Sequence, residues 1–197
     1  MAVLISIKPQ YVCKILNKEK ILEIRKSIPK CKLPCKVYIY CTKGKDLWMH
    51  NKETIILGNT DLTSYWLNGK VVAEFTLNRY DEIERDLNDW LPKNRYEAVK
   101  QQLKDSCLTE EELWKYGKGK TLYAWHIDDL IIYDKSKELS EFSKYGYEKL
   151  NGSSICSNSS CPFYIESNYY DLPPDCIYEK DCILKRPPQS WCYVGGE

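Results

Sequence analysis

The spacing of apolar and polar positions changes along the chain, and each change predicts an element. A short apolar run at 4–7 predicts a strand, and Pro9 followed by the apolar spacing of 11–16 predicts a helix. Strict alternation over 36–42 predicts a strand whose two faces differ. By the same signals we expect further strands at 21–25, 70–77, 121–127, 130–133 and 190–194, and a short helix at 136–142.

The middle of the chain has helical spacing. The segment 96–103 has the period of an amphipathic helix. A second helix is expected after Thr109, because Glu112 stands three residues later and completes a capping box, and Gly117 predicts its end. We therefore interpret 79–119 as a helical insertion.

Two segments show no clear period. Residues 43–69 are rich in turn formers and give no assignment. Residues 144–185 are rich in Ser, Asn, Tyr, Asp and Cys, which marks an irregular insertion in a single domain spanning 1–197. Five or six short strands with helices at their ends predict an α+β fold built on a small, strongly bent β-barrel.

Composition narrows the class of protein. Hydrophobic residues make up 43% of the 197 residues, enough for a core, and charged residues make up 29%, so general disorder is not expected. The apolar runs are far too short to span a membrane. The first run, ended by Lys8 and Pro9, is too short for a signal peptide. These features predict a soluble protein of the cytoplasm.

Charge is unevenly distributed although the net charge is only +1. Residues 1–36 carry nine Lys and Arg against two Glu, whereas residues 81–112 carry ten acids against five bases. A basic lobe of this kind can meet phosphates. The alternative is that these lysines only solvate a surface helix and its loops.

One short charged pattern stands out at the second predicted strand. Lys20, Glu23 and Arg25 are interleaved with Leu22 and Ile24. The pattern is typical either of a salt-bridged outer face of a strand or of a polar pocket. A further carboxylate, Glu74, lies inside an apolar strand and needs a partner, for which Arg25 or Lys20 is the natural expectation.

The order of these blocks resembles the ASCH branch of the PUA-like superfamily, in particular the small ASCH proteins of bacterial prophages and phages. The blocks are K-x-x-E-x-R at 20–25, KVYIY at 36–40, GKVVAEF at 69–75, WHI at 125–127 and PPQSWCYV at 187–194. The resemblance covers 3–42, 69–78, 120–142 and 186–194. The family's glycine before the lysine block is absent, and Asn17 is expected to adopt the left-handed conformation in its place.

The resemblance implies a PUA-like barrel with a cleft between barrel and helices, and recognition of RNA or of a modified nucleobase. One ASCH group is an amidohydrolase that deacetylates N4-acetylcytidine with a lysine, a threonine and a glutamate. Here the lysine falls on Lys20 and the glutamate on Glu74, but the threonine position falls on Glu23. If the protein is encoded by a phage, we expect it in the cytoplasm of the bacterial host cell.

A nucleobase pocket needs aromatic walls and a few fixed polar groups. The expected ligand-binding residues are Lys20, Glu23, Arg25, Glu74, Trp125, His126, Ser190 and Trp191, and in an enzyme Lys20, Glu23 and Glu74 would be catalytic. Burial would lower the pKa of Lys20, and nearby carboxylates would oppose that shift. With two glutamates expected nearby, we predict that Lys20 keeps its charge, which favours binding over catalysis. His126 is alternatively a core histidine, and Trp191 is alternatively part of the core.

The ten cysteines are expected to be reduced in a cytoplasmic protein. Four of them lie in the irregular insertion and could hold one structural zinc ion, namely Cys156, Cys161, Cys176 and Cys182. The alternative is four free thiols, or a disulfide formed on oxidation. Cys35 and Cys41, in or beside a predicted strand, are interpreted as small core residues.

Three functions from different classes therefore stand as hypotheses. The first is a binding module for RNA, a modified nucleoside or a nucleotide. The second is an amidohydrolase that acts on N4-acetylcytidine-like nucleosides. The third is a phage-encoded protein that modulates its host by binding another protein through the Cys-rich insertion.

Overall fold

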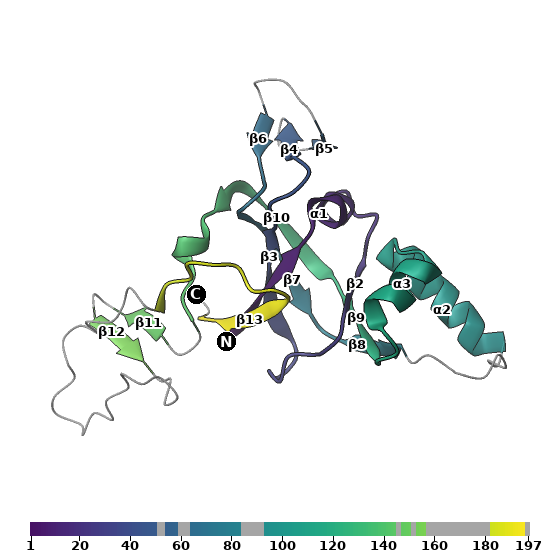
Figure 1. The fold of residues 1–197 in the computed structure, drawn as a ribbon. Helices are drawn as coiled ribbons and strands as arrows, with labels where there is room; N and C mark the ends of the chain where they lie inside the picture. Colours follow the sequence, from purple (N-terminus) through teal and green to yellow (C-terminus); the bar gives the residue numbers. More distant parts are fainter. Residues whose placement is uncertain are drawn as a thin grey trace.

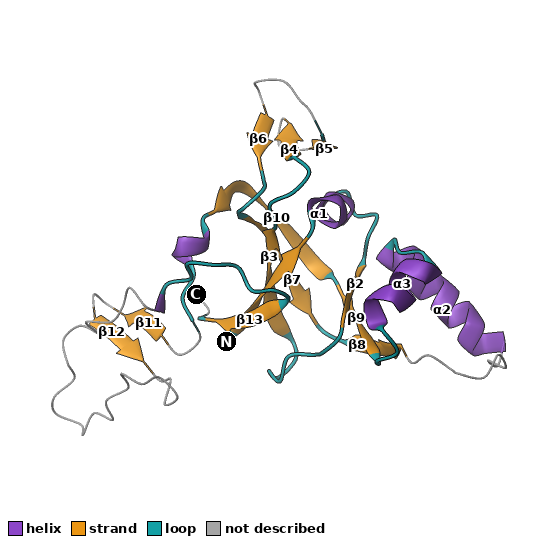
Figure 2. Ribbon diagram, viewed as in Figure 1, coloured by secondary structure: helices purple, strands orange, loops and turns teal. Residues whose placement is uncertain are grey.

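The computed structural model describes residues 1–50, 54–58, 64–83, 93–144, 147–150, 153–156 and 182–195 (Figure 1). In these ranges the strands form one five-stranded sheet, two three-stranded sheets and one two-stranded hairpin. Figure 2 shows the strands as the larger part of this structure, with one helix among them and two helices at one side. The mixed α+β class is as predicted.

The five-stranded sheet contains both ends of the described chain. Its order is β10 (Asp128–Lys137), β7 (Val71–Leu77), β3 (Cys35–Cys41), β1 (Ala2–Ile7) and β13 (Trp191–Val194). All neighbours are antiparallel except β1 and β3, which are parallel. Parallel neighbours need a crossover connection, and this one contains the helix α1 (Pro9–Leu16) and the strand β2 (Leu22–Arg25).

A second sheet lies beside the first and has the order β2, β9 (Leu122–His126) and β8 (Tyr80–Ile83). Strand β2 pairs with β9 on one side only, so it is an edge strand. Among the described residues the strands therefore form separate sheets and not the closed barrel that we predicted. The expected helical insertion 79–119 also begins with a strand, β8, whose polar sequence gives little periodicity.

The main core fills the space on one face of the five-stranded sheet. The alternation in β3 separates its faces as predicted: Val37, Ile39 and Cys41 enter this core, while Tyr38 and Tyr40 enter a smaller core on the other face. Cys35 and Cys41 are buried, as predicted. Burial raises the pKa of the Cys41 thiol to about 12, which fits a packing role.

Two helices cover the outer face of the second sheet, α2 (Lys93–Ser106) and α3 (Glu110–Gly117). The capping box of α3 is confirmed, because the Glu112 amide donates to Thr109 Oγ1 at 3.2 Å and the Thr109 amide donates to Glu112 at 2.9 Å. The predicted role of Gly117 needs correction. Lys118 takes the left-handed conformation that ends the helix, and Gly117 instead lets Leu122 approach to 3.1 Å of the place where a Cβ would stand.

Other elements were missed or misjudged. The unassigned segment 43–69 forms a small sheet of β4 (Leu47–His50), β5 (Thr54–Leu57) and β6 (Ser64–Trp66), which projects from the rest in Figure 1. The helix expected at 136–142 is only a 3₁₀ turn at Leu139–Glu141, because β10 continues to Lys137 in its pairing with β7.

The irregular insertion 144–185 is described only in part. It contains a hairpin of β11 (Tyr147–Leu150) and β12 (Ser153–Cys156). Cys161 and Cys176 lie outside the described residues, so the zinc site stays a prediction. No helix of the described part of the chain has the length and apolar character to cross a bilayer.

Candidate functional site

Lys20, Glu23 and Arg25 form one buried charge cluster, named so below. The three residues are 3%, 7% and 6% exposed. Lys20 lies in the turn between α1 and β2, where its amide donates to the Lys14 carbonyl. The left-handed residue of this turn is Lys18, with a φ of 62°, and not Asn17 as we expected. The cluster is therefore not an exposed strand face, and its ion pairs form inside the protein.

The Lys20 ammonium group uses all three of its donors within the protein. It donates to the carbonyl of Leu22 at 2.7 Å and to that of Ser106 at 2.8 Å. Its third contact is an ion pair with Glu23 at 3.3 Å. Ser106 is the last residue of α2, so this amine ties the helical insertion to β2. A fully used amine positions other groups and is not free to attack a substrate.

The pKa of Lys20 is lowered from its ordinary value. Burial is the main cause, and the Glu23 carboxylate opposes the shift without cancelling it. We predicted two opposing carboxylates, but Glu23 is the only one that acts on Lys20 in the described residues. The carboxylates therefore oppose the effect of burial on the Lys20 pKa less than we predicted.

Arg25 connects the two sheets at the edge of β2. Its guanidinium lies 3.0 Å from Glu23, and it donates to the carbonyl of Ser6 in β1 at 2.9 Å. A second nitrogen donates to Ser190 Oγ, just before β13, at 3.3 Å. No backbone ladder joins β2 to β1 among the described strands. The Arg25 side chain makes the polar connection there.

Two buried N–H groups at this place have no acceptor within the described residues: Arg25 Nε and Trp125 Nε1. Glu23 pairs with Trp125 in the β2–β9 ladder, so Arg25 and Trp125 are diagonal neighbours on one face. Trp125 is fully buried. A buried donor without an acceptor is unfavourable by about 1–3 kcal/mol. One more such donor in the described structure, Trp48 Nε1 in β4, lies outside this site, so it is the presence of two of them at one place that distinguishes the site.

Two partly exposed aromatic rings, Trp191 and Tyr116, contact residues of this site. The ring of Trp191 lies 6.2 Å from that of Trp125, and its indole N–H donates to Ser27 Oγ at 3.1 Å. Tyr116 of α3 lies beside Arg25, and Lys26 lies 4.8 Å from its ring centre. Burial raises the pKa of the Tyr116 phenol although Arg25 acts against this. Trp191 is half-buried and Tyr116 is 37% exposed. Both rings are therefore partly accessible to solvent, whereas the charged residues of the cluster are buried.

Glu74 is not part of this cluster. Its carboxylate pairs with Lys36 at 3.1 Å and accepts a hydrogen bond from Tyr133. It lies opposite Tyr38 in the β3–β7 ladder, on the face of the small core. The predicted ion pair of Glu74 with Arg25 or Lys20 is therefore wrong. The pairing of β3 with β7 gives it Lys36 as a partner.

The pKa of the Glu74 carboxyl is lowered. Burial alone would raise it, but the hydrogen bonds from Tyr133 and Lys36 and the charges of Lys36 and Lys137 together outweigh burial. Glu74 is therefore an ionised, paired carboxylate.

His126 also lies elsewhere. It pairs with Leu22 in the ladder, on the face opposite Glu23, and its Nε2 lies 2.8 Å from an Asp81 carboxylate oxygen. The structure thus brings together Lys20, Glu23, Arg25, Trp125, Ser190 and Trp191 from the predicted set, and it does not bring Glu74 or His126 to them.

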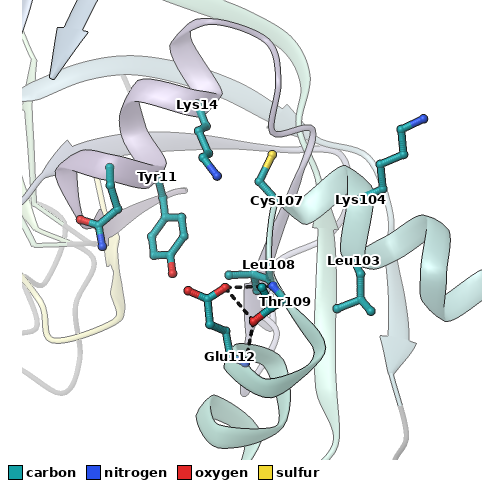
Figure 3. A pocket seen from close by; sticks show the side chains of 9 residues that line it. Tyr11, Lys14, Leu103, Lys104, Cys107, Leu108, Thr109 and Glu112 are labelled. Atoms are coloured by element: carbon teal, nitrogen blue, oxygen red, sulfur yellow. Dashed lines mark hydrogen bonds between the residues drawn. The ribbon is translucent and has the colours of Figure 1, made fainter.

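A pocket of about 560 Å³ lies next to the Lys20 end of the cluster (Figure 3). Its lining comes from α1, from the end of α2 and from the start of α3, namely Gln10, Tyr11, Lys14, Leu103, Lys104, Cys107, Leu108, Thr109 and Glu112. The ring of Tyr11 connects it to the cluster, since the Lys20 amine lies 5.6 Å from the ring centre. The sequence interpretation missed this pocket, because only the folded chain brings α1 to the insertion.

Comparisons with known proteins find similar solved structures, with TM-scores below 0.5. No family model and no curated protein matches the chain. The crystal structure of ASCH from Zymomonas mobilis is 16% identical over 70% of this chain and 73% of that chain, with a TM-score of 0.47. Two mutant forms of that protein are 15% and 16% identical over 70% of this chain and 76% and 74% of theirs, with TM-scores of 0.45 and 0.46. These three structures carry the name ASCH, the family that the sequence blocks resemble, while the link to phages stays a prediction.

Proposed function

We propose that this protein binds RNA, or a modified nucleoside or nucleotide, at the Arg25 end of the buried charge cluster. The observation that carries the proposal is the pair of buried donors, Arg25 Nε and Trp125 Nε1, that lack an acceptor in the described structure. Carbonyl oxygens of a base and oxygens of a phosphate are acceptors that suit such donors.

The surroundings of Arg25 support the same chemistry. Trp191 and Tyr116 offer flat rings on which a base can stack. Ser190 offers a hydroxyl beside the guanidinium. Glu23 binds both cations of the cluster and so fixes the direction of the guanidinium. Because Arg25 Nε and Trp125 Nε1 are buried, a ligand must open a path to them as it binds.

Binding is better supported than hydrolysis. An amidohydrolase would need Lys20 and Glu74 at one reacting centre, but these two described residues form no ion pair with each other. All three Lys20 donors are already used. A host-modulating protein contact through 144–185 depends on residues that are mostly outside the described ranges.

The test is native mass spectrometry of the protein after incubation with nucleosides, including N4-acetylcytidine, and with short RNAs. The decisive variant is Trp125→Phe, because it keeps an aromatic ring and removes the buried N–H. Arg25→Lys keeps the charge and removes Nε as a directed donor. Trp66→Phe is the matched control, since Trp66 lies on the β6 strand of the small sheet and is 46% exposed.

We expect a retained nucleoside or RNA that is lost in both site variants and kept in the control. Binding that Trp125→Phe and Arg25→Lys leave unchanged would contradict the proposal, as would the absence of any binding. Release of cytidine from N4-acetylcytidine, abolished by Lys20→Ala, would favour the amidohydrolase instead.

A further inference from the structure

The pocket beside α1 has features that the proposed function does not use. It opens at the Lys20 end of the buried charge cluster, whereas the proposed site lies at the Arg25 end. Its volume of about 560 Å³ lies within the range of small-molecule sites, roughly 300–1,000 Å³.

The ring of Tyr11 forms an aromatic wall of this pocket. Figure 3 shows its hydroxyl directed at the Glu112 carboxylate, and burial together with this carboxylate raises the pKa of the phenol. Glu112 is itself held by the amide of Thr109 at 2.9 Å and by its hydroxyl at 3.2 Å. The ring thus faces a carboxylate that is itself held by the cap of α3, with Leu103 and Leu108 as apolar lining in the same pocket.

Lys14 gives the pocket a cation, whose charge also helps to lower the pKa of the Glu112 carboxyl in the same lining. It follows Tyr11 by three residues, which places both side chains on the same side of α1. Its ammonium group makes no hydrogen bond or ion pair within the described ranges, and Figure 3 shows it directed between Tyr11 and Cys107. Lys104 adds a second cation to the lining. An aromatic wall beside two cations, with Glu112 as the one carboxylate of the lining, suits a base with its phosphate.

We infer that this pocket holds a second nucleotide of the same RNA, with its base on Tyr11 and its phosphate on Lys14. The inference rests on the proposed function and narrows its ligand class: the preferred ligand is a single-stranded oligonucleotide and not a free nucleoside. The first nucleotide meets Arg25 and Trp125, and the buried charge cluster lies between the two positions.

The test compares a mononucleoside with a mixed-sequence RNA tetranucleotide by isothermal titration calorimetry, at two salt concentrations. Tyr11→Leu removes the flat ring and keeps an apolar side chain. Lys14→Gln removes the charge on a partly exposed residue, so the fold is preserved. Lys135→Gln is the matched control, on an exposed part of β10 away from the pocket lining.

We expect the tetranucleotide to bind at least tenfold more tightly than the mononucleoside. Tyr11→Leu should weaken tetranucleotide binding about fivefold or more, the effect of losing one base stack. Lys14→Gln should weaken it by the loss of one phosphate contact. Both variants should bind the mononucleoside as the unmodified protein does, and Lys135→Gln should bind both ligands unchanged. Lys14→Gln should also reduce the salt dependence of log K by about 0.7, the contribution of one phosphate contact on a single strand.

The outcomes distinguish a failure of the pocket inference from a failure of the proposed function. Tetranucleotide binding that neither Tyr11→Leu nor Lys14→Gln weakens would overturn the pocket inference and leave the proposed function intact. Binding that depends on Tyr11 and Lys14 but not on Arg25 or Trp125 would overturn the proposed function and leave the pocket as the RNA site. If neither ligand binds, both are overturned.

Discussion

Two carboxylates that the sequence grouped into one site, Glu23 and Glu74, lie in different surroundings. Glu23 binds Lys20 and Arg25, whose side chains are 2% and 7% exposed. Glu74 binds Lys36, whose side chain is 44% exposed. The first carboxylate is thus part of a desolvated network and the second belongs to a half-exposed pair. Two carboxylates for which the sequence predicts similar ion pairs can therefore contribute very differently to the free energy of unfolding.

The largest expected effect is that of Glu23→Gln. The change leaves Lys20 and Arg25 buried without their carboxylate, and breaking a buried pair from one side is unfavourable by about 3–5 kcal/mol. The measurement is the free energy of unfolding from urea titration. A loss below about 1 kcal/mol, the range of exposed pairs, would remove the distinction between the two carboxylates.

Lys20→Met should have the next largest effect. The variant removes the bonds to the carbonyls of Leu22 and Ser106, and hydrogen bonds to charged groups contribute about 1.5–3 kcal/mol. Because the Ser106 bond ties α2 to β2, amide hydrogen exchange at the end of α2 should also become faster. Unchanged exchange there would show that Lys20 does not hold the insertion.

The pH dependence of the Lys20 contribution sharpens the comparison. Its pKa is lower in the folded state than in the unfolded chain, so between the two values the unfolded state binds more protons. Stability of the unmodified protein relative to Lys20→Met should therefore rise with pH across that interval. If the difference in stability between the two proteins instead falls with pH in that interval, pairing with Glu23 outweighs burial in its effect on the Lys20 pKa.

The smallest effect is expected for Glu74→Gln. Solvent screening of Lys36 limits the pair to about 0–1 kcal/mol. The pKa of Glu74 is lowered in the folded state, so its contribution is present at neutral pH and is lost as the pH falls through that pKa. Thermal unfolding at neutral and acidic pH measures it, and a loss as large as that of Glu23→Gln would contradict the account.

Local patterns in the sequence predicted local structure well. The alternation of β3 fixed its two faces, and Thr109 with Glu112 marked the start of α3, because each depends on residues close in the chain. The position of Glu74 depends on a distant strand. The β3–β7 register decides that it meets Lys36 and not Lys20, and no local pattern contains that register.

The candidate site could be predicted only in part for the same reason. The spacing of Lys20, Glu23 and Arg25 was visible, and the resemblance to ASCH proteins added Trp125, Ser190 and Trp191. The pocket needs α1 to meet the insertion, and its only sequence signal is the three-residue spacing of Tyr11 and Lys14. The sheet of β4, β5 and β6 was missed because its strands are short and lie among turn residues.

The most direct test of the central claim is a ¹H–¹⁵N correlation spectrum recorded while nucleosides or short RNA are added. It reports the N–H groups of Trp125 and Arg25 themselves, with the indole signal assigned by Trp125→Phe. If the ligand supplies their acceptor, the Trp125 Nε1–H and Arg25 Nε–H signals should shift strongly, and the Trp66 indole signal should stay in place. A ligand that binds while neither buried N–H signal moves would contradict the account.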